Sequence, residues 1–228
     1  MYGHTVEMRV VTWNLFHGRS VPPENRDLMD RFAELIASWS WDVALLQEVP
    51  PWWPPSLAAA ASAQQRTALT SRNQLLPLRR ALARRWPELT RSGGGGANAI
   101  LVRGTITAHA RRRLVLKPER RVVHAVRDDA GRWFANLHTT VYDDPQARRE
   151  IALARTTALR WSEGAPLVLG GDFNVRDPRL PGFAHAGGRG VDHVFACCGL
   201  TPIESVDVLE RGPLSDHPPV RVTLDLRA

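Results

Sequence analysis

Several apolar segments of this sequence lie next to side chains that can bind a metal or move a proton. Asp172 and Asn174 follow the apolar run 166–169 within the tetrapeptide GDFN, and Asp216 and His217 lie shortly before the run 220–226. Strand ends are rigid positions at which side chains from distant parts of a chain can meet. We therefore expect one pocket to collect the whole set, which comprises Asn14, Glu48, His138, Asp172, Asn174, Asp192, Asp216 and His217.

The residue types in this set fit the hydrolysis of a phosphate ester. Carboxylates such as Glu48 and Asp216 are hard oxygen ligands, which Mg²⁺ or Mn²⁺ prefers. Asp172 can orient or deprotonate an attacking water, and the Asn174 amide can hydrogen-bond a phosphoryl oxygen without adding negative charge. A histidine such as His217 that a buried aspartate orients can supply positive charge or a proton. The set therefore predicts a metal-dependent phosphoesterase.

Other chemistries are not supported by the sequence. No serine is set in a nucleophile elbow, and the glycine run 93–96 lacks the Lys-Ser/Thr ending of a P-loop. The only cysteines, Cys197 and Cys198, are adjacent. Neighbouring cysteines rarely form an unstrained disulfide, and no second Cys pair suggests zinc. We expect both to be buried thiols in or beside a strand.

Short apolar strands and amphipathic helices alternate along the chain, and these elements must position the polar residues. We expect strands at 8–13, 42–47, 99–103, 121–126, 133–137, 166–169, 191–196 and 220–226. Helices are expected at 24–38, around a stripe of Leu75, Leu78, Leu82 and Trp86, and at 144–162, where Asp144 caps the helix. No repeat or long linker divides the chain, so we predict one domain over residues 1–228.

Two adjacent tryptophans, Trp52 and Trp53, lie in the proline-bracketed segment 50–56, which reads as a loop. Their rings could clamp a substrate, because aromatic faces stack on bases and sugars. Such a pair can also pack the loop onto its own domain. The sequence favours this second interpretation without deciding it.

Composition and charge place limits on partners and location. The chain of 228 residues carries a formal charge of +7, and Lys117 is its only lysine. Arginine suits phosphate oxygens, and a basic surface attracts polyanions such as DNA or RNA, although arginine usage can also reflect genome base composition. No apolar stretch is long enough to span a membrane, and we identify no amphipathic membrane element. We expect a cytoplasmic monomer without stable membrane insertion.

Seven ordered segments carry a resemblance to a known family: TWNL (Thr12–Leu15), LQE (Leu46–Glu48), NAILV (Asn98–Val102), NLH (Asn136–His138), GDFN (Gly171–Asn174), VDHV (Val191–Val194) and SDHPPV (Ser215–Val220). Together they resemble the endonuclease/exonuclease/phosphatase, or DNase I-like, superfamily. The resemblance implies an α/β four-layer sandwich, in which helices flank two central, mostly antiparallel mixed sheets. It also implies Mg²⁺ or Mn²⁺ as the cofactor.

The resemblance assigns roles residue by residue. Asn14, Glu48 and Asp216 would lie at the metal. Asn98 and Asn174 would contact the substrate. The catalytic group would comprise His138, Asp172, Asn174, Asp192 and His217, in which Asp192 pairs with His217.

The identity of the ester is the weaker prediction. His138 stands where abasic-site endonucleases usually carry a tyrosine, so the resemblance argues against abasic-site repair. Because the chain is basic, we predict a nucleic-acid phosphodiester as the substrate. The alternatives are a small-molecule or phospholipid phosphate ester and, third, an inactive fold that only binds a partner.

Overall fold

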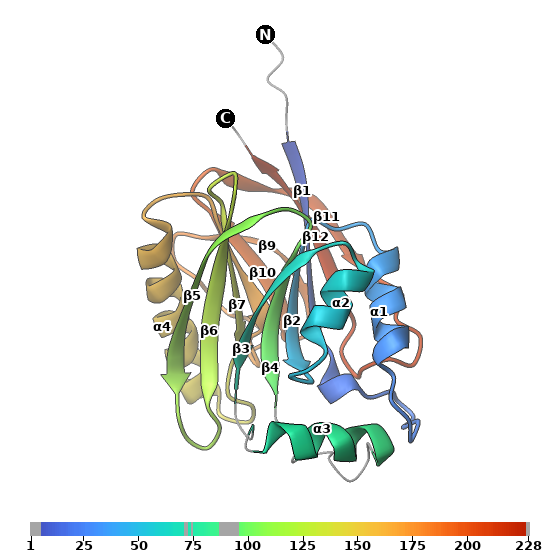
Figure 1. Ribbon diagram of the computed structural model, residues 1–228. Helices are drawn as coiled ribbons and strands as arrows, with labels where there is room; N and C mark the ends of the chain where they lie inside the picture. Colours follow the sequence, from blue (N-terminus) through green and yellow to red (C-terminus); the bar gives the residue numbers. More distant parts are fainter. Residues whose placement is uncertain (1–5, 71–72, 74, 87–95, 227–228) are drawn as a thin grey trace.

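Two six-stranded β-sheets face each other in the computed structural model, which describes residues 6–70, 73, 75–86 and 96–226 (Figure 1). The first sheet has the order β11-β12-β1-β2-β4-β3 and the second the order β5-β6-β7-β8-β10-β9. Only β1–β2 and β7–β8 pair in parallel, and the other neighbours are antiparallel. The sheets are therefore mixed and mostly antiparallel, as the sequence predicts.

The strands of the first sheet are β1 (Val6–Asn14), β2 (Val43–Val49), β3 (Gln64–Leu69), β4 (Ala97–Val102), β11 (Leu200–Val208) and β12 (Val220–Leu226). Those of the second are β5 (Ile106–Val115), β6 (Arg121–Asp128), β7 (Trp133–His138), β8 (Leu167–Asp172), β9 (Ala184–Arg189) and β10 (Asp192–Cys197). All eight strands expected from the sequence are present, and all but β12 have shifted ends. The structure adds β3, β5, β9 and β11, whose sequences are more polar than the apolar runs that predict the other strands.

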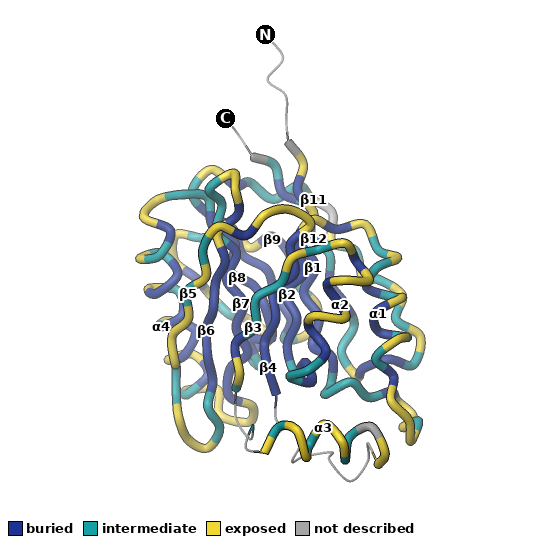
Figure 2. Tube along the Cα trace, viewed as in Figure 1, coloured by how far each residue is buried: buried dark blue, intermediate teal, exposed yellow. Residues whose placement is uncertain are grey.

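Apolar side chains of both sheets meet in the centre of the sandwich. Val10, Leu45 and Phe134 are fully buried there, and the tube in Figure 2 shows the central strands buried along most of their length. Helices α1 (Met29–Ser38) and α2 (Pro54–Ala60) cover the outer face of the first sheet, and α4 (Asp144–Ser162) covers that of the second. The layers are therefore helix, sheet, sheet and helix, which confirms the predicted four-layer α/β sandwich.

One predicted helix start and one predicted N-cap are wrong. The helix expected from residue 24 begins at Met29, because the Glu24 carboxylate pairs with Arg26 and Arg31 while its backbone N–H donates to Ser20 Oγ. The long helix at 144–162 has the predicted bounds, but its N-cap is Asp143 instead of Asp144. The Asp143 carboxylate accepts a hydrogen bond from the Gln146 N–H at 2.9 Å, as an N-cap does.

The segment 50–56 is only partly a loop, since α2 begins at Pro54, a position where a helix tolerates proline. Trp53 is buried and its ring centroid lies 5.3 Å from that of Phe32, so it packs the segment onto the core. Trp52 packs against the same apolar cluster. Cys197 is a buried free thiol in β10 and Cys198 a half-buried one beside it.

Helix α3 (Leu76–Arg85) differs from the others, because its apolar stripe is not covered. Leu75, Leu78 and Trp86 on this stripe are 72%, 55% and 50% exposed. The helix lies beyond the ends of β2 and β4, at one end of the sandwich (Figure 1). Neither α3 nor any other described helix is long and apolar enough to cross a membrane.

Candidate functional site

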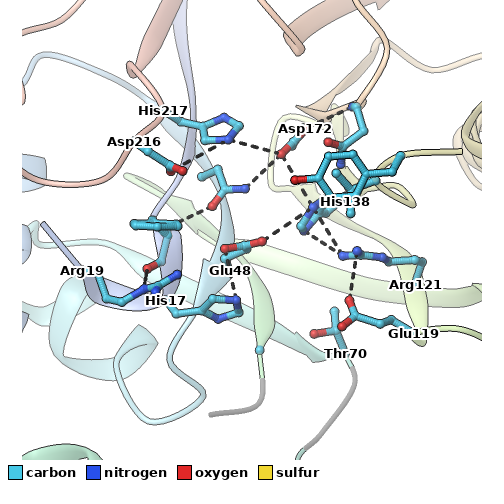
Figure 3. A pocket seen from close by; sticks show the side chains of 16 residues that line it. His17, Arg19, Glu48, Thr70, Glu119, Arg121, His138, Asp172, Asp216 and His217 are labelled. Atoms are coloured by element: carbon cyan, nitrogen blue, oxygen red, sulfur yellow. Dashed lines mark hydrogen bonds and ion pairs between the residues drawn. The ribbon is translucent and has the colours of Figure 1, made fainter. Parts of the chain in front are cut away.

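A cavity of about 490 Å³ opens at the end of the sandwich where β1, β2, β7 and β8 have their carboxyl ends (Figure 3). The two parallel pairs explain this convergence. Asn14 is in register with Gln47, next to Glu48, and His138 is in register with Asp172. The lining comprises Asn14, Phe16, His17, Arg19, Glu48, Thr70, Gly96, Glu119, Arg121, His138, Val141, Tyr142, Asp172, Asn174, Asp216 and His217.

Asp172 sits at the base of this cavity, at the end of β8. Gly171 precedes it with a φ of +140°, and a Cβ there would lie 2.0 Å from the Leu137 carbonyl oxygen, so the approach of β8 to β7 requires glycine. The Asp172 carboxylate accepts hydrogen bonds from the Asn14 side-chain amide and from the Asn174 backbone N–H, both at 2.9 Å. Burial, together with the nearby charge of Asp192, raises the pKa of Asp172 to about 7. Its carboxyl group can therefore exchange a proton near neutral pH.

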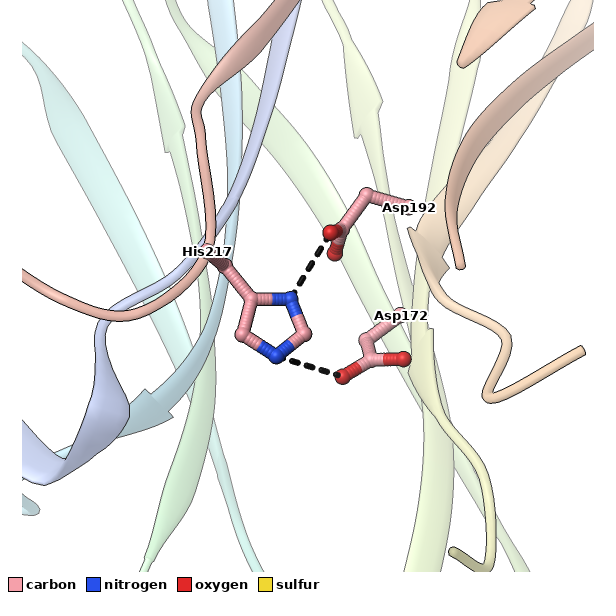
Figure 4. A group of neighbouring side chains, drawn as sticks. All are labelled: Asp172, Asp192 and His217. Carbon is pink, nitrogen blue, oxygen red and sulfur yellow. Dashed lines mark hydrogen bonds and ion pairs between the residues drawn. The ribbon is translucent and has the colours of Figure 1, made fainter. Parts of the chain in front are cut away.

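His217 is held against a second buried carboxylate (Figure 4). Its Nδ1 lies 2.7 Å from Asp192 Oδ2, and its Nε2 faces Asp172 Oδ2 at 4.0 Å. Burial alone would lower the pKa of His217, but the hydrogen bond and charge of Asp192 outweigh it and raise that pKa to about 9. At neutral pH His217 is thus an imidazolium that points Nε2 at Asp172.

The loop that carries His217 is fixed from both sides. Ser215 Oγ donates to the Asn14 carbonyl oxygen at 2.6 Å and accepts from the His217 N–H at 3.0 Å. The indole N–H of Trp13 donates to the His217 carbonyl oxygen at 2.8 Å. These bonds join the SDH segment to the end of β1, so His217 and Asn14 keep a fixed separation.

Oxygen donors suited to a metal lie beside this pair. Glu48 interrupts the regular pairing of β2 with a φ of +49°, and its carboxylate lies between His17 and His138, at 3.2 and 3.9 Å (Figure 3). Asn14 and Asp216 line the same cavity. Two carboxylates and an amide oxygen around a polar cavity fit a hard divalent cation such as Mg²⁺, which retains several waters.

Asp172, Asp192 and His217 also place ligand atoms within 4.8 Å of one another. A cation there would have to displace the hydrogen bond between His217 and Asp192 and the proton of the imidazolium. Metal binding requires a neutral imidazole. The donor set of Asn14, Glu48 and Asp216 is therefore the better fit.

Of the other predicted residues, His138 and Asn174 line the cavity and Asn98 does not. His138 is buried in the cavity wall, and burial, together with the charge of Arg121, holds its pKa well below the usual range. Asn174 lines the cavity while its side chain donates to the Thr139 carbonyl oxygen at 3.0 Å. Asn98 does not line the cavity: it is fully buried, and its amide donates to the Val122 carbonyl oxygen at 3.3 Å.

Three basic residues of the cavity are among those not identified from the sequence: His17, Arg19 and Arg121. The guanidinium of Arg121 lies 3.1 Å from Nδ1 of His138 and 3.0 Å from the Glu119 carboxylate. Arg121 is nearly buried, yet it contributes to the cavity wall. In a sequence with 30 basic residues nothing sets it apart, except its place at the start of an apolar strand.

The chain belongs to the endonuclease/exonuclease/phosphatase family, which it matches over residues 11–217. The solved structures that it resembles include an endonuclease/exonuclease/phosphatase from Beutenbergia cavernae (19% identity, 96% of this chain and 72% of that chain, TM-score 0.70). TDP2 from Caenorhabditis elegans is 17% identical over 96% of this chain and 74% of that one, with a TM-score of 0.66.

A third similar structure is the mannosyl-6-phosphatase Bt3783 from Bacteroides thetaiotaomicron, with 16% identity, 95% and 99% coverage and a TM-score of 0.64. No curated protein matches the chain by sequence. At these identities the structural likeness shows the fold, and the chemistry has to be argued from the cavity.

Proposed function

We propose that the protein is a Mg²⁺-dependent phosphodiesterase, and that Mn²⁺ can replace Mg²⁺. The observation that carries this proposal is the pairing of Asp172 with His217. Asp172 titrates near neutral pH, whereas His217 holds its proton to higher pH. The two side chains face each other beside oxygen donors for a cation. Two groups whose surroundings separate their pKa values in this way suit a proton acceptor and a positively charged partner.

In the proposed reaction Asn14, Glu48 and Asp216 hold the cation. When bound, the metal neutralises charge on the phosphoryl oxygens and on the leaving group. The Asp172 carboxylate accepts a proton from the water that attacks phosphorus.

The remaining residues bind the ester. The imidazolium of His217, oriented by Asp192, stabilises the charge that develops on the phosphoryl oxygens. Neutral His138 and the Asn174 amide bind further phosphoryl oxygens without adding negative charge. The bond between phosphorus and the leaving oxygen then breaks. That oxygen takes up a proton from solvent, and Asp172 releases the proton that it accepted to solvent.

For the substrate we propose a nucleic-acid phosphodiester. The net charge of +7 and the arginines of the cavity wall, Arg19 and Arg121, support a polyanion. A small-molecule or phospholipid ester is the second candidate, because a cavity of about 490 Å³ is within the size range of small-ligand sites. An inactive binding fold is the least supported, since every predicted catalytic side chain is present.

A screen with Mg²⁺ or Mn²⁺ tests this proposal against plasmid DNA, RNA, bis-p-nitrophenyl phosphate and sphingomyelin, with Asp172→Ala as the blank. We expect metal-dependent cleavage of DNA or RNA that weakens steeply with added salt, since each released counterion contributes to the salt slope. Turnover of bis-p-nitrophenyl phosphate without binding of DNA or RNA at low salt would select the small-ester alternative. Hydrolysis that persists in the Asp172→Ala protein would reject the catalytic assignment.

Replacing Arg121 with methionine is expected to weaken substrate binding. The loss of a charge-assisted hydrogen bond to phosphate corresponds to a rise in KM of roughly 10-fold to 100-fold. The shape of the side chain is largely kept, so the fold should persist. Steady-state kinetics of Arg127→Met, a replacement on the exposed face of the same strand, provide the control. Equal KM values for the Arg121→Met and Arg127→Met proteins would show that Arg121 does not contact the substrate.

A further inference from the structure

The apolar face of α3 is exposed to solvent. Leu75, Leu78, Leu82 and Trp86 follow one another at intervals of three and four residues. Leu78 and Leu82 lie one turn apart within α3, and Leu75 and Trp86 flank the helix as its N-cap and C-cap. Such a stripe normally packs on a core, as those of α1 and α4 do. Here three of the four side chains are at least half exposed, so the face is accessible to a partner.

The charges around this face restrict the partner. Residues 75–86 contain four arginines and no acidic residue. Arg85 is exposed, and its guanidinium carbon lies 5.6 Å from the centroid of the Trp86 ring, whereas Arg80 lines a pocket between α3 and Trp52 on the other side of the helix. An apolar stripe beside an arginine is typical of helices that lie at the surface of an anionic membrane, so α3 is a candidate for the amphipathic membrane element that we did not identify from the sequence. A second copy of this chain would bring arginines against arginines, and a nucleic acid would leave Leu75 and Leu78 uncovered.

The position of α3 connects this face to the catalytic cavity. The helix belongs to the excursion of the chain between Thr70 and Gly96, whose backbone groups are hydrogen-bonded at 3.0 Å. Thr70 and Gly96 both line the cavity, and the Arg120 side chain donates to the Thr70 carbonyl oxygen at 3.1 Å. A surface that binds α3 therefore lies close to the rim of the cavity.

We propose that α3 docks the protein onto the surface of an anionic phospholipid bilayer. Leu75, Leu78 and Trp86 enter the interface between head groups and acyl chains, while Arg85 binds a lipid phosphate or carboxylate. The docked protein presents its cavity rim to the bilayer. This proposal goes beyond the proposed function and does not require it, because binding can be measured with a protein that cannot hydrolyse esters.

Co-sedimentation with vesicles tests the proposal. Vesicles of phosphatidylcholine alone are compared with an equal mixture of phosphatidylcholine and phosphatidylserine, at low salt and without metal. We expect binding to the mixed vesicles, and equal binding by the Asp172→Ala protein. The combined replacement Leu75→Ser, Leu78→Ser and Trp86→Ser should weaken it roughly 100-fold. Arg85→Gln should weaken it roughly 5-fold.

Matched controls distinguish binding through the α3 face from nonspecific binding of the protein to vesicles. Val206→Ser replaces a half-exposed valine of β11, and Arg160→Gln an exposed arginine of α4, and neither should change vesicle binding. The α3 replacements are on exposed positions, so unchanged thermal unfolding should confirm that they fold.

Three results would overturn the proposal. The first is absence of binding to the mixed vesicles, and the second is binding that survives the triple serine replacement. The third is evidence that another partner covers the α3 face. That partner would be a second copy of the chain if the serine replacements dissociate a dimer, or a nucleic acid if oligonucleotide binding depends on α3 and vesicle binding does not.

Discussion

Replacing Asp172 with asparagine is expected to abolish phosphoester hydrolysis and, in the metal-free protein, to raise the melting temperature above about pH 7. The carboxylate is the proposed proton acceptor, so its loss should lower the rate roughly 1000-fold or more. The same carboxylate is buried close to Asp192, which makes its ionised form costly to the fold. The amide keeps the size of the side chain and removes that charge.

The pH dependence gives the sign of the stability effect. Asp172 has a pKa of about 7 in the folded protein, against 3.8 for an ordinary aspartate. Between these values the folded state holds more protons than the unfolded state, so the parent protein loses stability as pH rises through this window. The asparagine variant lacks this loss. Its advantage in melting temperature should therefore be small near about pH 4 and largest above about pH 7.

Calorimetry of the metal-free proteins over this pH range, together with turnover in Mg²⁺, measures both effects. Asp177→Asn is the matched control, because Asp177 is exposed and the hydrogen bond from Arg148 lowers its pKa. That variant should keep full activity and gain no stability at alkaline pH. An Asp172→Asn protein that is destabilised equally at every pH would show that the carboxylate is not strained by burial.

Most of the polar residues that the sequence singles out meet at one cavity, because they lie at or near strand ends. Asn14, Glu48, His138 and Asp172 are at or next to the carboxyl ends of two parallel strand pairs, and short apolar runs before a polar residue are visible without a structure. Asp192 could be paired with His217 only through the family resemblance. In the fold, the antiparallel register of β8 and β10 places Asp192 opposite Asp172.

The features that the sequence could not predict depend on contacts between residues that are far apart in the sequence. The high pKa of His217 and the low pKa of His138 follow from which charged group each one faces, and both are histidines at the end of an apolar run or beside one. Arg121 reaches the cavity because β6 lies beside β7. Asn98 is near the amino end of β4, which runs antiparallel to β2 and so brings Asn98 to the same edge of the sheet as Asn14, yet its side chain turns into the protein. An apolar stripe such as that of α3 predicts an amphipathic helix. It does not predict whether the stripe packs on the core or stays exposed.

Replacing Glu48 with glutamine should abolish metal-dependent turnover while leaving the fold intact. The substitution preserves the shape of the side chain and removes one of the two anionic ligands of the proposed set. We expect the affinity for Mg²⁺ or Mn²⁺ to fall by more than about 100-fold, since even replacing the partners of metal ligands costs 10-fold to 100-fold. Because a bound cation stabilises the folded state, the rise of melting temperature with added metal should also disappear.

A second cavity carboxylate provides the comparison. Glu119 pairs with Arg121 at 3.0 Å, so Glu119→Gln changes the charge of the cavity without removing a proposed ligand. This variant should keep its stabilisation by metal. If the Glu48→Gln protein instead responds to metal as the parent does, the cation is held elsewhere, and the cluster of Asp172, Asp192 and His217 is the remaining group among the described residues. Asp192→Asn would then remove the response, and His217 would have to give up its proton when the metal binds.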